Sequence, residues 1–337
     1  MSVSSKTPSN QIIIDLLGGA VGSLTPPADR PMDYGRKLID AGLSAVNLTM
    51  ALYARDIRPV LKEFFDFQNL FADGHETLLQ VLTTADIEKA ASQGKLGVIQ
   101  GVQGLHFIED ETAYIQVLSH LGLRVAALTY NEQTVFGAGC LELSDTGLTL
   151  LGRRVVQELN RCNILVDVSH AANRTCLDII ANSSKPVAAT HSNAFALTPS
   201  DRNITDEQIK AIAAAGGVVG ISPYSPFCVT AEGGRPTIND LMDHFRYVAD
   251  LVGPQHVAVG TDFFPHSKIK WENGTRRMYP EMAGQFVFET LYTDGMAGHA
   301  DLPKLPAALE QAGFSADEVT AICSGNALRV LSAAWGA

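Results

Sequence analysis

Two histidines end two short apolar runs of the chain, and they are the residues best suited to bind a metal. His170 ends the run at 163–170 and His191 ends the run at 185–191, with a helical pattern between the runs. Strand, helix and strand form a βαβ unit, which makes the strands parallel and places both side chains at one edge of the sheet. Neutral imidazoles there are good ligands for zinc or another divalent metal. The alternative is that each histidine only makes hydrogen bonds at a strand end.

Apolar runs of the strand type recur along the whole chain and alternate with helical patterns. These runs lie at 12–15, within 41–50, and at 96–100, 124–130, 163–170, 185–191, 218–222 and 257–262. Eight strands alternating with helices predict an α/β fold, a (β/α)8 TIM barrel. A doubly wound open sheet is rejected, because no Gly-x-Gly-x-x-Gly loop follows the first run and polar residues end the runs around the whole set.

The helical patterns and loops complete this picture. Thr205 is expected to cap a helix, because two acidic residues follow it in the first turn. Extra C-terminal helices are expected at about 305–312 and 316–331. We expect one barrel domain over 1–337, with a long loop or lid at 263–300, where little periodicity is visible.

Composition limits the class of protein. The chain has 337 residues, 46% of them hydrophobic, which is enough for a large core. A net charge of −11 without a Lys/Arg cluster argues against a nucleic-acid partner. The five cysteines are scattered without a CxxC pair, and the polar start of the sequence lacks the apolar core of a signal peptide. No apolar run reaches about 18 residues, so we expect a cytoplasmic protein with no membrane partner.

Other polar residues at strand ends should meet the histidines on the top face of the barrel. Asp262 follows the last strand, and further candidates are Asp15, Gln103, Tyr130, Asn131 and Tyr224. Two histidines and a carboxylate can hold a divalent ion that lowers the pKa of a water molecule. Asp262 could ligate this ion or accept the proton of the water. The alternative is that Asp262 only holds a loop through hydrogen bonds.

Several segments resemble the membrane dipeptidase (renal dipeptidase) family of metallopeptidases. They are LGLRVAALTYN, the central stretch from GLTLLGRR to ATHSNAFAL, RNITDEQIKAIAAAGGVVGI, HVAVGTDF and SGNALRVL, in the family's order over nearly the whole chain. The resemblance implies a metal-dependent amidohydrolase-like barrel, usually dimeric, that hydrolyses dipeptides at a two-metal site. It implies that His170 and His191 ligate one metal and that Asp262 handles the catalytic proton. It also implies that Arg202 holds the substrate carboxylate, a task suited to its bidentate fork.

The chain departs from the family pattern on the side of the other metal. The family's first strand ends in a His-x-Asp pair, and the aligned residues here are Leu17 and Gly19. The bridging glutamate aligns with Gln103, with Gln100 as a less favoured substitute. Tyr130 stands where animal members carry a histidine that supports the substrate. Because an amide oxygen cannot balance two close divalent charges, we expect at most one tightly bound metal per chain.

The leading prediction is a metal-dependent hydrolase, a homodimer, acting on a dipeptide or a related small carboxylated amide. Its metal would lie on His170, His191 and Gln103, and Tyr130, Asn131 and Tyr224 would join Arg202 in binding substrate. One alternative is a mononuclear hydrolase or lyase of a different small substrate. Another is a catalytically silent barrel that binds a ligand. Retention of the metal, carboxylate and proton-transfer residues favours an enzyme, whereas loss of three ligands favours either alternative over an ordinary dipeptidase.

Overall fold

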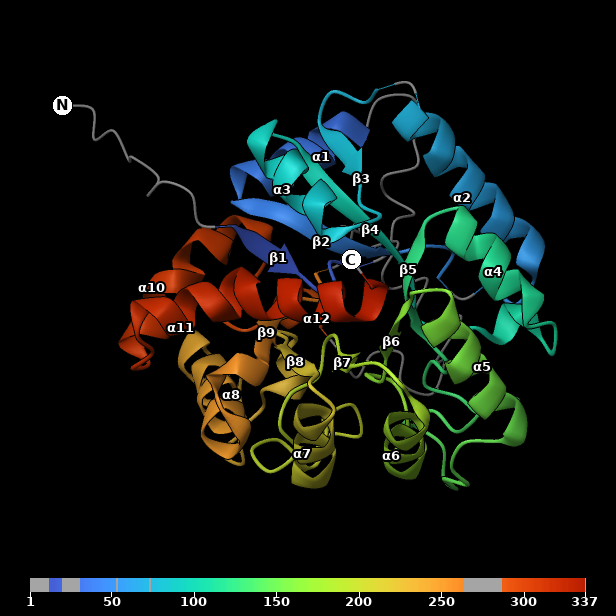
Figure 1. Ribbon diagram of the computed structural model, residues 1–337. Helices are drawn as coiled ribbons and strands as arrows, with labels where there is room; N and C mark the ends of the chain where they lie inside the picture. Colours follow the sequence, from blue (N-terminus) through green and yellow to red (C-terminus); the bar gives the residue numbers. More distant parts are fainter. Residues whose placement is uncertain (1–11, 20–30, 53, 73, 264–286, 337) are drawn as a thin grey trace.

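Eight parallel strands close a ring within the part of the chain that the computed structural model describes, namely residues 12–19, 31–52, 54–72, 74–263 and 287–336 (Figure 1). β9 pairs with both β8 and β1, and β2 pairs with β4, which joins the two ends of the sheet. The ring strands are β1 (Ile13–Asp15), β2 (Leu43–Thr49), β4 (Leu96–Val102), β5 (Leu123–Ala127), β6 (Leu165–Asp167), β7 (Val187–Ala189), β8 (Val218–Ile221) and β9 (Val257–Val259). The prediction of a (β/α)8 barrel is confirmed.

Helices surround the ring, as the alternating pattern predicts (Figure 1). They are α1 (Pro31–Asp40), α2 (Ile57–Ala72), α3 (Thr84–Ser92), α4 (Ala113–His120), α5 (Leu150–Arg161), α6 (Asn173–Asn182), α7 (Asp206–Ala214) and α8 (Ile238–Val252). The predicted cap at Thr205 is confirmed: its hydroxyl accepts a hydrogen bond from the backbone of Gln208, and its backbone N–H donates to the Gln208 side chain. Further helices follow the last strand: α10 (Leu305–Gln311), α11 (Ala316–Thr320) and α12 (Asn326–Trp335).

One strand was not predicted from the sequence. β3 (Leu78–Gln80) pairs in parallel with the first half of β4 and lies outside the closed ring. Only Leu78 of its three residues is buried, so the segment lacks the continuous apolar run of the ring strands, and the surrounding stretch is dominated by α2 and α3. β3 is therefore an addition to the barrel and does not change its closure.

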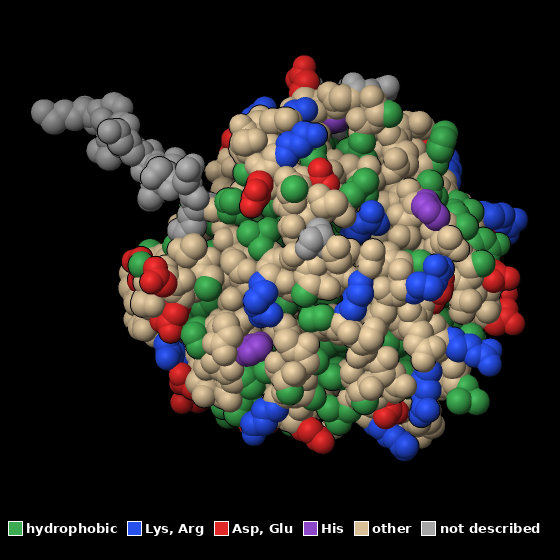
Figure 2. Space-filling model, in the orientation of Figure 1, with side chains coloured by type: hydrophobic (Ala, Val, Ile, Leu, Met, Phe, Trp, Pro, Cys, Tyr) green, Lys and Arg blue, Asp and Glu red, His purple; other side chains and the backbone are tan. Residues whose placement is uncertain are grey.

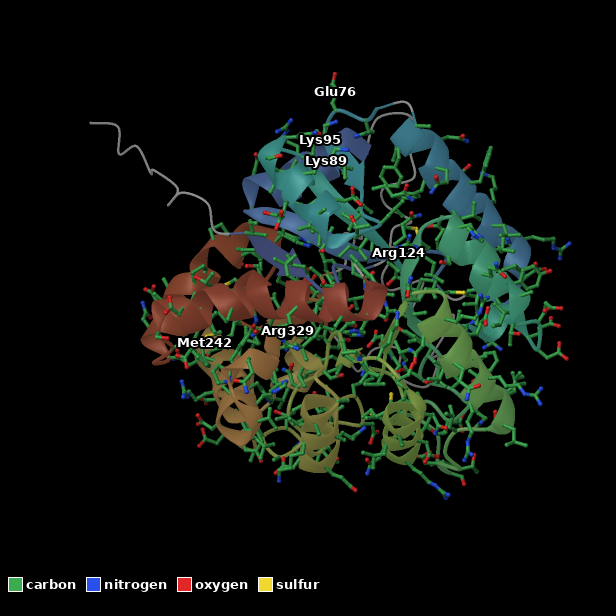
Figure 3. All side chains as sticks on the ribbon, in the orientation of Figure 1. Glu76, Lys89, Lys95, Arg124, Met242 and Arg329 are labelled. Atoms are coloured by element: carbon green, nitrogen blue, oxygen red, sulfur yellow. The ribbon has the colours of Figure 1, made fainter. Side chains whose placement is uncertain are left out.

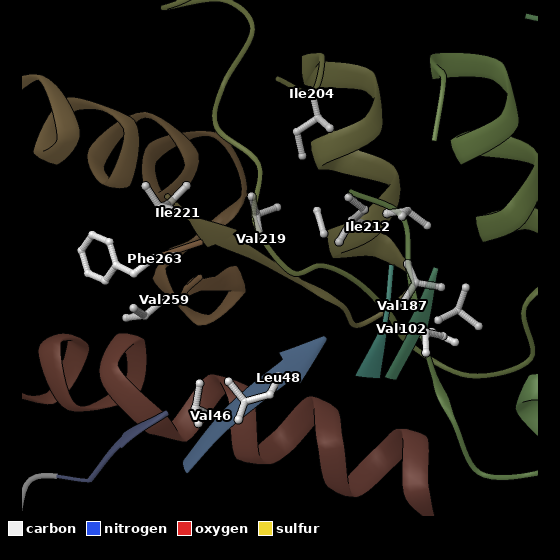
Figure 4. Close-up of a cluster of buried hydrophobic side chains, with 14 of the residues drawn as sticks. Val46, Leu48, Val102, Val187, Ile204, Ile212, Val219, Ile221, Val259 and Phe263 are labelled. Carbon is white, nitrogen blue, oxygen red and sulfur yellow. The ribbon is translucent and has the colours of Figure 1, made fainter. Parts of the chain in front are cut away.

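The apolar core has two layers. The outer one lies between the ring and its helices and includes Val46, Leu48, Val102, Val219 and Ile221 (Figure 4). The inner one fills the ring with a side chain from every ring strand: Ile14, Ala45, Ile99, Val125, Leu165, Ala188, Val218 and Ala258. Because each strand alternates its side chains between the two faces, both layers can be apolar at once.

Helix α12 closes one end of the ring. Its residues Val330, Leu331 and Trp335 pack on the inner layer, and the Trp335 indole donates a 3.0 Å hydrogen bond to the Arg124 carbonyl. Arg329, labelled on this helix in Figure 3, donates to the carbonyl oxygens of Gly216 and Gln255 at 2.7 and 2.8 Å. Polar residues that carry out chemistry therefore have to lie at the opposite end of the ring, where the strands finish.

The outer surface is mixed in charge. On the face shown in Figure 2, Lys and Arg side chains are interspersed with Asp and Glu. Within the described residues, none of the helices has both the length and the apolar character needed to cross a membrane. The predicted lid at 263–300 lies largely at 264–286, outside the described residues, so the lid and the single domain over 1–337 stay predictions.

Candidate active site

His170 and His191 meet at the carboxyl end of the ring. His170 lies just beyond β6 and His191 just beyond β7, and α6 connects the two strands. Parallel pairing places Val166 opposite Val187, so both strands finish at the same edge. The two side chains are buried, and their Nε2 atoms lie 3.1 Å apart. The sequence argument for one shared edge therefore agrees with the geometry.

Gln103 and Asn131 contact opposite sides of the His170 ring. The Oε1 atom of Gln103 lies 2.8 Å from Nε2, and the Oδ1 atom of Asn131 lies 2.7 Å from Nδ1. The amide nitrogen of Gln103 donates to the Thr49 hydroxyl at 2.8 Å, which turns Oε1 toward the histidine. Gln100 accepts a hydrogen bond from Gln80 instead. Of the two amides considered from the sequence, Gln103 is thus the one beside the histidines.

Both histidines are neutral near pH 7. Burial lowers the pKa of His170 and of His191 well below the ordinary value of 6.5, and the positive charge of Arg202 lowers both further. The Nδ1 atom of His170 faces Asn131, and that of His191 lies 2.8 Å from the Thr190 hydroxyl oxygen. With a proton on each Nδ1, the two Nε2 atoms present lone pairs to each other.

This arrangement of lone pairs fits a single divalent ion. In this tautomer, two nitrogen lone pairs 3.1 Å apart, with the Gln103 oxygen beside them, repel one another unless a cation draws them together. Zinc–nitrogen bonds of about 2.0–2.1 Å place two ligands of a tetrahedron roughly 3.3 Å apart, close to the observed separation. No group of three His, Cys, Asp or Glu suited to a metal occurs among the described residues, and the donor atom beside the two histidines is the amide oxygen of Gln103.

The side of the site that carries the second metal in the resembled family has no ligating side chain. Leu17 is buried, and its carbonyl accepts a 2.7 Å hydrogen bond from the Asp262 backbone. Gly19 adopts a left-handed φ of 87° and accepts a hydrogen bond from the Thr49 backbone. An aliphatic group and a glycine cannot bind a dication. The described residues therefore fit one metal at this site and not two.

Arg202 lies directly against the two histidines. Its guanidinium donates to the Ser169 carbonyl, and Nη2 lies 3.4 Å from Nε2 of His170 and 3.4 Å from the His191 carbonyl. The ring of Phe227 lies beneath it, 5.1 Å from the guanidinium carbon. A planar cation in this position can receive a carboxylate next to a metal.

Asp262 supplies a buried carboxyl group just beyond β9. It is 7% exposed, and its Oδ1 atom has no hydrogen-bond partner among the described residues. Burial raises its pKa to about 7, Arg202 lowers it, and the charges of Asp15 and Asp167 raise it. Its φ of 52° is unusual for a residue with a side chain. A carboxyl that titrates near neutral pH can both accept and donate a proton.

Asp15 has a different position from the other strand-end candidates. Its carboxyl accepts hydrogen bonds from the Thr261 backbone and hydroxyl and from the Leu17 backbone. Burial raises its pKa to about 7 as well. These bonds join β1 to the chain after β9, so Asp15 holds the ring closed below the site.

Of the remaining candidates, Tyr130 contacts a histidine and Tyr224 contacts the phenyl ring that lies beneath Arg202. The Tyr130 ring stacks on His170 with centroids 4.1 Å apart, and a small cavity beside Tyr130 and Gln103 is walled by residues such as Met50 and Leu52. Tyr224 packs against Phe227, with centroids 4.9 Å apart. That Tyr130, Asn131 and Tyr224 contact a substrate stays a prediction.

The volume of a cavity does not by itself locate this site. A cavity of about 540 Å³ lies between α8 and α10, where Met242 (labelled in Figure 3), Arg246 and Ala308 line it. Its lining includes the carboxylate of Asp243 but contains no histidine. The chemistry is concentrated instead in the tightly filled region around His170.

Sequence reasoning missed the polar residues behind the histidines. Asp167, Ser169 and Thr190 are all buried, and Ser169 and Thr190 both donate hydrogen bonds to the Asp167 carboxylate. The only trace in the sequence is that a hydroxyl residue directly precedes each histidine and that an aspartate lies three residues before His170, in VDVSH and AATH.

Comparisons with known proteins agree on one family. The family model described as "Membrane dipeptidase (Peptidase family M19)" matches residues 34–283. An uncharacterized dipeptidase of Schizosaccharomyces pombe is 32% identical over 224 residues, 64% of this chain and 53% of that protein. Dipeptidase aclJ of Aspergillus oryzae is 28% identical over 249 residues, 71% of this chain and 52% of that protein. The chain thus spans about half the length of these two relatives.

A solved structure extends the likeness to the whole fold. The crystal structure of an amidohydrolase from Pseudomonas aeruginosa superposes with a TM-score of 0.85 at 30% identity. The match covers 97% of this chain and 97% of that one. The barrel and the elements that follow it are therefore shared along nearly the full length.

Proposed function

The chain belongs to the membrane dipeptidase family of metal-dependent hydrolases, and we propose that it hydrolyses a dipeptide or a related small carboxylated amide. The observation that carries the proposal is the convergence of Nε2 of His170, Nε2 of His191 and Oε1 of Gln103. Arg202 lies against this group, and Asp262 lies just beyond the last strand at the same edge of the ring. Metal ligands, a carboxylate anchor and a proton carrier are thus available at one end of the barrel.

We propose that His170, His191 and Gln103 hold one divalent ion, zinc being the metal best suited to imidazole ligands that leave open positions. When bound, such an ion lowers the pKa of a water molecule and polarises the carbonyl of the scissile bond. The two neutral imidazoles orient their Nε2 lone pairs, and Gln103 adds a neutral oxygen. Leu17 and Gly19 offer nothing to a second ion.

Arg202 would bind the free carboxylate of the substrate. Its guanidinium already has its Nη atoms at the Ser169 carbonyl, the His191 carbonyl and His170. A carboxylate is a stronger acceptor than these carbonyl oxygens and can form two parallel bonds with the fork. This contact would fix the distance between the carboxylate and the scissile bond.

Asp262 would move the proton. Its Oδ1 atom, which has no hydrogen-bond partner within the described part of the chain, is the natural acceptor for a proton of the attacking water. Because its pKa is about 7, the protonated form can then give the proton to the leaving nitrogen. Burial keeps bulk water from competing for this proton.

Metal analysis together with a substrate panel tests the proposal. After dialysis, elemental analysis of the purified protein should give one metal per chain, and His191→Ala should give none. Dipeptides and N-acyl amino acids assayed with added zinc or manganese should show turnover that a chelator abolishes. A second fully occupied metal beside Leu17, or no retained metal in the parent protein, would refute the proposed site.

A second candidate reaction is favoured by the neutral ligand at Gln103 and the missing ligands at Leu17 and Gly19. A mononuclear site of low negative charge suits hydrolysis of another small acyl bond, or carbon–carbon cleavage, better than two-metal peptide hydrolysis. Turnover of small acyl esters or keto acids without turnover of dipeptides or N-acyl amino acids would favour it. Bound metal without any turnover would favour the silent ligand-binding barrel.

We also propose a homodimer. Val135, Leu143 and Leu150 are large apolar side chains that are more than half exposed, and burial in a partner would remove them from water. Light scattering of the purified protein should give about twice the chain mass. A monomer at micromolar concentration would contradict this.

A further inference from the structure

A chain of two hydrogen bonds leads from His191 to a buried carboxylate. Nδ1 of His191 lies 2.8 Å from the Thr190 hydroxyl oxygen, and that hydroxyl donates to Oδ2 of Asp167 at 2.7 Å. The three side chains are at most 2% exposed. Asp167 ends β6 and Thr190 follows β7, so two neighbouring ring strands build the chain.

The acceptors of this chain fix its direction. Oδ1 of Asp167 accepts from the Ser169 backbone and hydroxyl and from the Thr190 backbone, at 2.9, 2.5 and 3.1 Å. A carboxylate can only accept, so the one proton of the Thr190 hydroxyl points to Oδ2. The hydroxyl oxygen is then the acceptor for His191, whose Nδ1 must carry the hydrogen. A neutral imidazole has a single N–H, so Nε2 of His191 keeps its lone pair.

His170 is held in a different way. Its Nδ1 atom lies 2.7 Å from Oδ1 of Asn131, a neutral amide oxygen that also accepts from the Cys140 thiol at 3.3 Å. Both rings thus direct Nε2 toward the same point, but a negative charge stands only behind His191. A carboxylate can accept a hydrogen bond from the group to which the ring N–H donates. This makes the other ring nitrogen a better donor to a metal.

We infer that Asp167, acting through Thr190, is a positioning group that directs the Nε2 lone pair of His191 at the bound cation and strengthens that bond. The inference rests on the proposed metal site and deepens it. It assigns the two imidazoles unequal parts, with His191 as the stronger ligand. Asp167 and Thr190 do not touch the metal or the substrate themselves.

Asp167 also joins the backbones of Ser169 and Thr190, so a purely structural role has to be separated from a positioning role. Thr190→Val removes the hydroxyl and keeps the shape, whereas Thr190→Ser keeps the hydroxyl and removes a methyl group. The zinc affinity of the full chain should be measured by competition with a chromophoric chelator. We expect Thr190→Val to weaken zinc binding by roughly 10–100-fold and Thr190→Ser to stay close to the parent protein.

A second readout reports the ring directly. With ¹⁵N-labelled histidine, proton–nitrogen correlation spectra of the metal-free protein should show His191 as the Nδ1–H tautomer in the parent and in Thr190→Ser. Thr190→Val should give a mixture of tautomers. If Thr190→Val does not fold, Asp167→Asn, which keeps the shape without the charge, should give the weakened zinc binding.

The outcomes separate this inference from the proposed function. The inference would be overturned if the parent and Thr190→Val had equal zinc affinity and the same His191 tautomer. It would also be overturned if Thr190→Ser lost as much zinc affinity as Thr190→Val. If the parent bound no zinc, the proposed metal site would fail, yet the spectra would still test the hydrogen-bond chain. An Nε2–H tautomer of His191 in the parent would overturn the inference whatever the metal result.

Discussion

Nη2 of Arg202 lies 3.4 Å from Nε2 of His170, so the proposed carboxylate anchor touches a proposed metal ligand. Both the guanidinium and a bound cation are attracted to the same lone pair. A substrate carboxylate that pairs with Arg202 would reduce this competition. Metal and carboxylate should therefore each increase the affinity of the site for the other, because such coupling is reciprocal.

Arg202→Ala should discriminate between substrates by their free carboxylate. Loss of a desolvated charge-assisted contact costs roughly 2–5 kcal/mol, which predicts that KM rises by at least roughly 30-fold for carboxylated substrates. Esters or amides of the same compounds should lose much less, because they make no such contact. Steady-state kinetics on matched pairs checks this, and equal losses on both members of each pair would assign Arg202 to structure alone.

His170→Ala and His191→Ala should each abolish tight metal binding and leave the fold intact. Both side chains lie beyond the strand ends, outside the two apolar layers of the core. His256→Ala is a matched control, because His256 precedes β9 at the other end of the ring. Metal content by elemental analysis and folding by circular dichroism should be measured together. Unchanged metal content in both site variants would contradict the assignment.

Gln103→Glu should strengthen metal binding. A carboxylate 2.8 Å from the His170 nitrogen would bring a negative charge to the ion, and charged ligands bind divalent metals better than amides. We expect zinc affinity to increase at least roughly tenfold, about 1.4 kcal/mol, with the stoichiometry staying at one. Gln103→Met, which removes the oxygen, should weaken binding. A Gln103→Glu variant that holds zinc no better than the parent would show that residue 103 does not face the metal.

Asp262→Asn should change how stability depends on pH. Burial raises the pKa of Asp262 from 3.8 to about 7, so the folded state favours the protonated group. Its contribution to the free energy of unfolding is fully present below pH 3.8 and is lost as the pH rises through 7. The difference between these pKa values corresponds to roughly 4 kcal/mol.

The amide of Asp262→Asn does not titrate, so the metal-free variant should become more stable than the metal-free parent as the pH rises from 4 to 8. Thermal unfolding in the presence of a chelator measures this difference. Turnover should fall by roughly 10²–10⁴-fold, because no proton carrier remains. Stability curves of parent and variant that stay parallel across this range would place the Asp262 carboxyl in water.

The ring strands could be predicted because burial on both faces requires continuous apolar runs, and eight such runs recur between helical patterns. β3 could not, because it lies outside the ring and only Leu78 of its three residues is buried. The C-terminal end was only partly foreseen: one helix was expected at 316–331, and the structure has α11, a π-helical turn at Ala321–Gly325 and α12. That α12 packs under the ring depends on long-range contacts that no local pattern encodes.

The meeting of His170 and His191 was predictable because parallel strands finish at one edge, whatever their side chains are. The contacts behind them were not. Asp167 ends β6 and Thr190 directly follows β7, where polar residues are common. Only the structure shows that the two form consecutive hydrogen bonds to His191. Asn131 was expected beside the substrate, and the structure places its Oδ1 atom against Nδ1 of His170. The position of a residue at a strand end does not determine which way its side chain points.

The closure of the ring by β9 and α12 has a consequence for biosynthesis. β1 pairs with β9 across more than two hundred residues, and the apolar inner layer stays open at one end until 326–335 have been made. For most of its translation, the nascent chain on the ribosome therefore has unpaired strand edges, and water contacts the apolar residues of its inner layer. Contacts this distant in sequence also form slowly. Chaperones that shield apolar surface should therefore assist folding until α12 has been made.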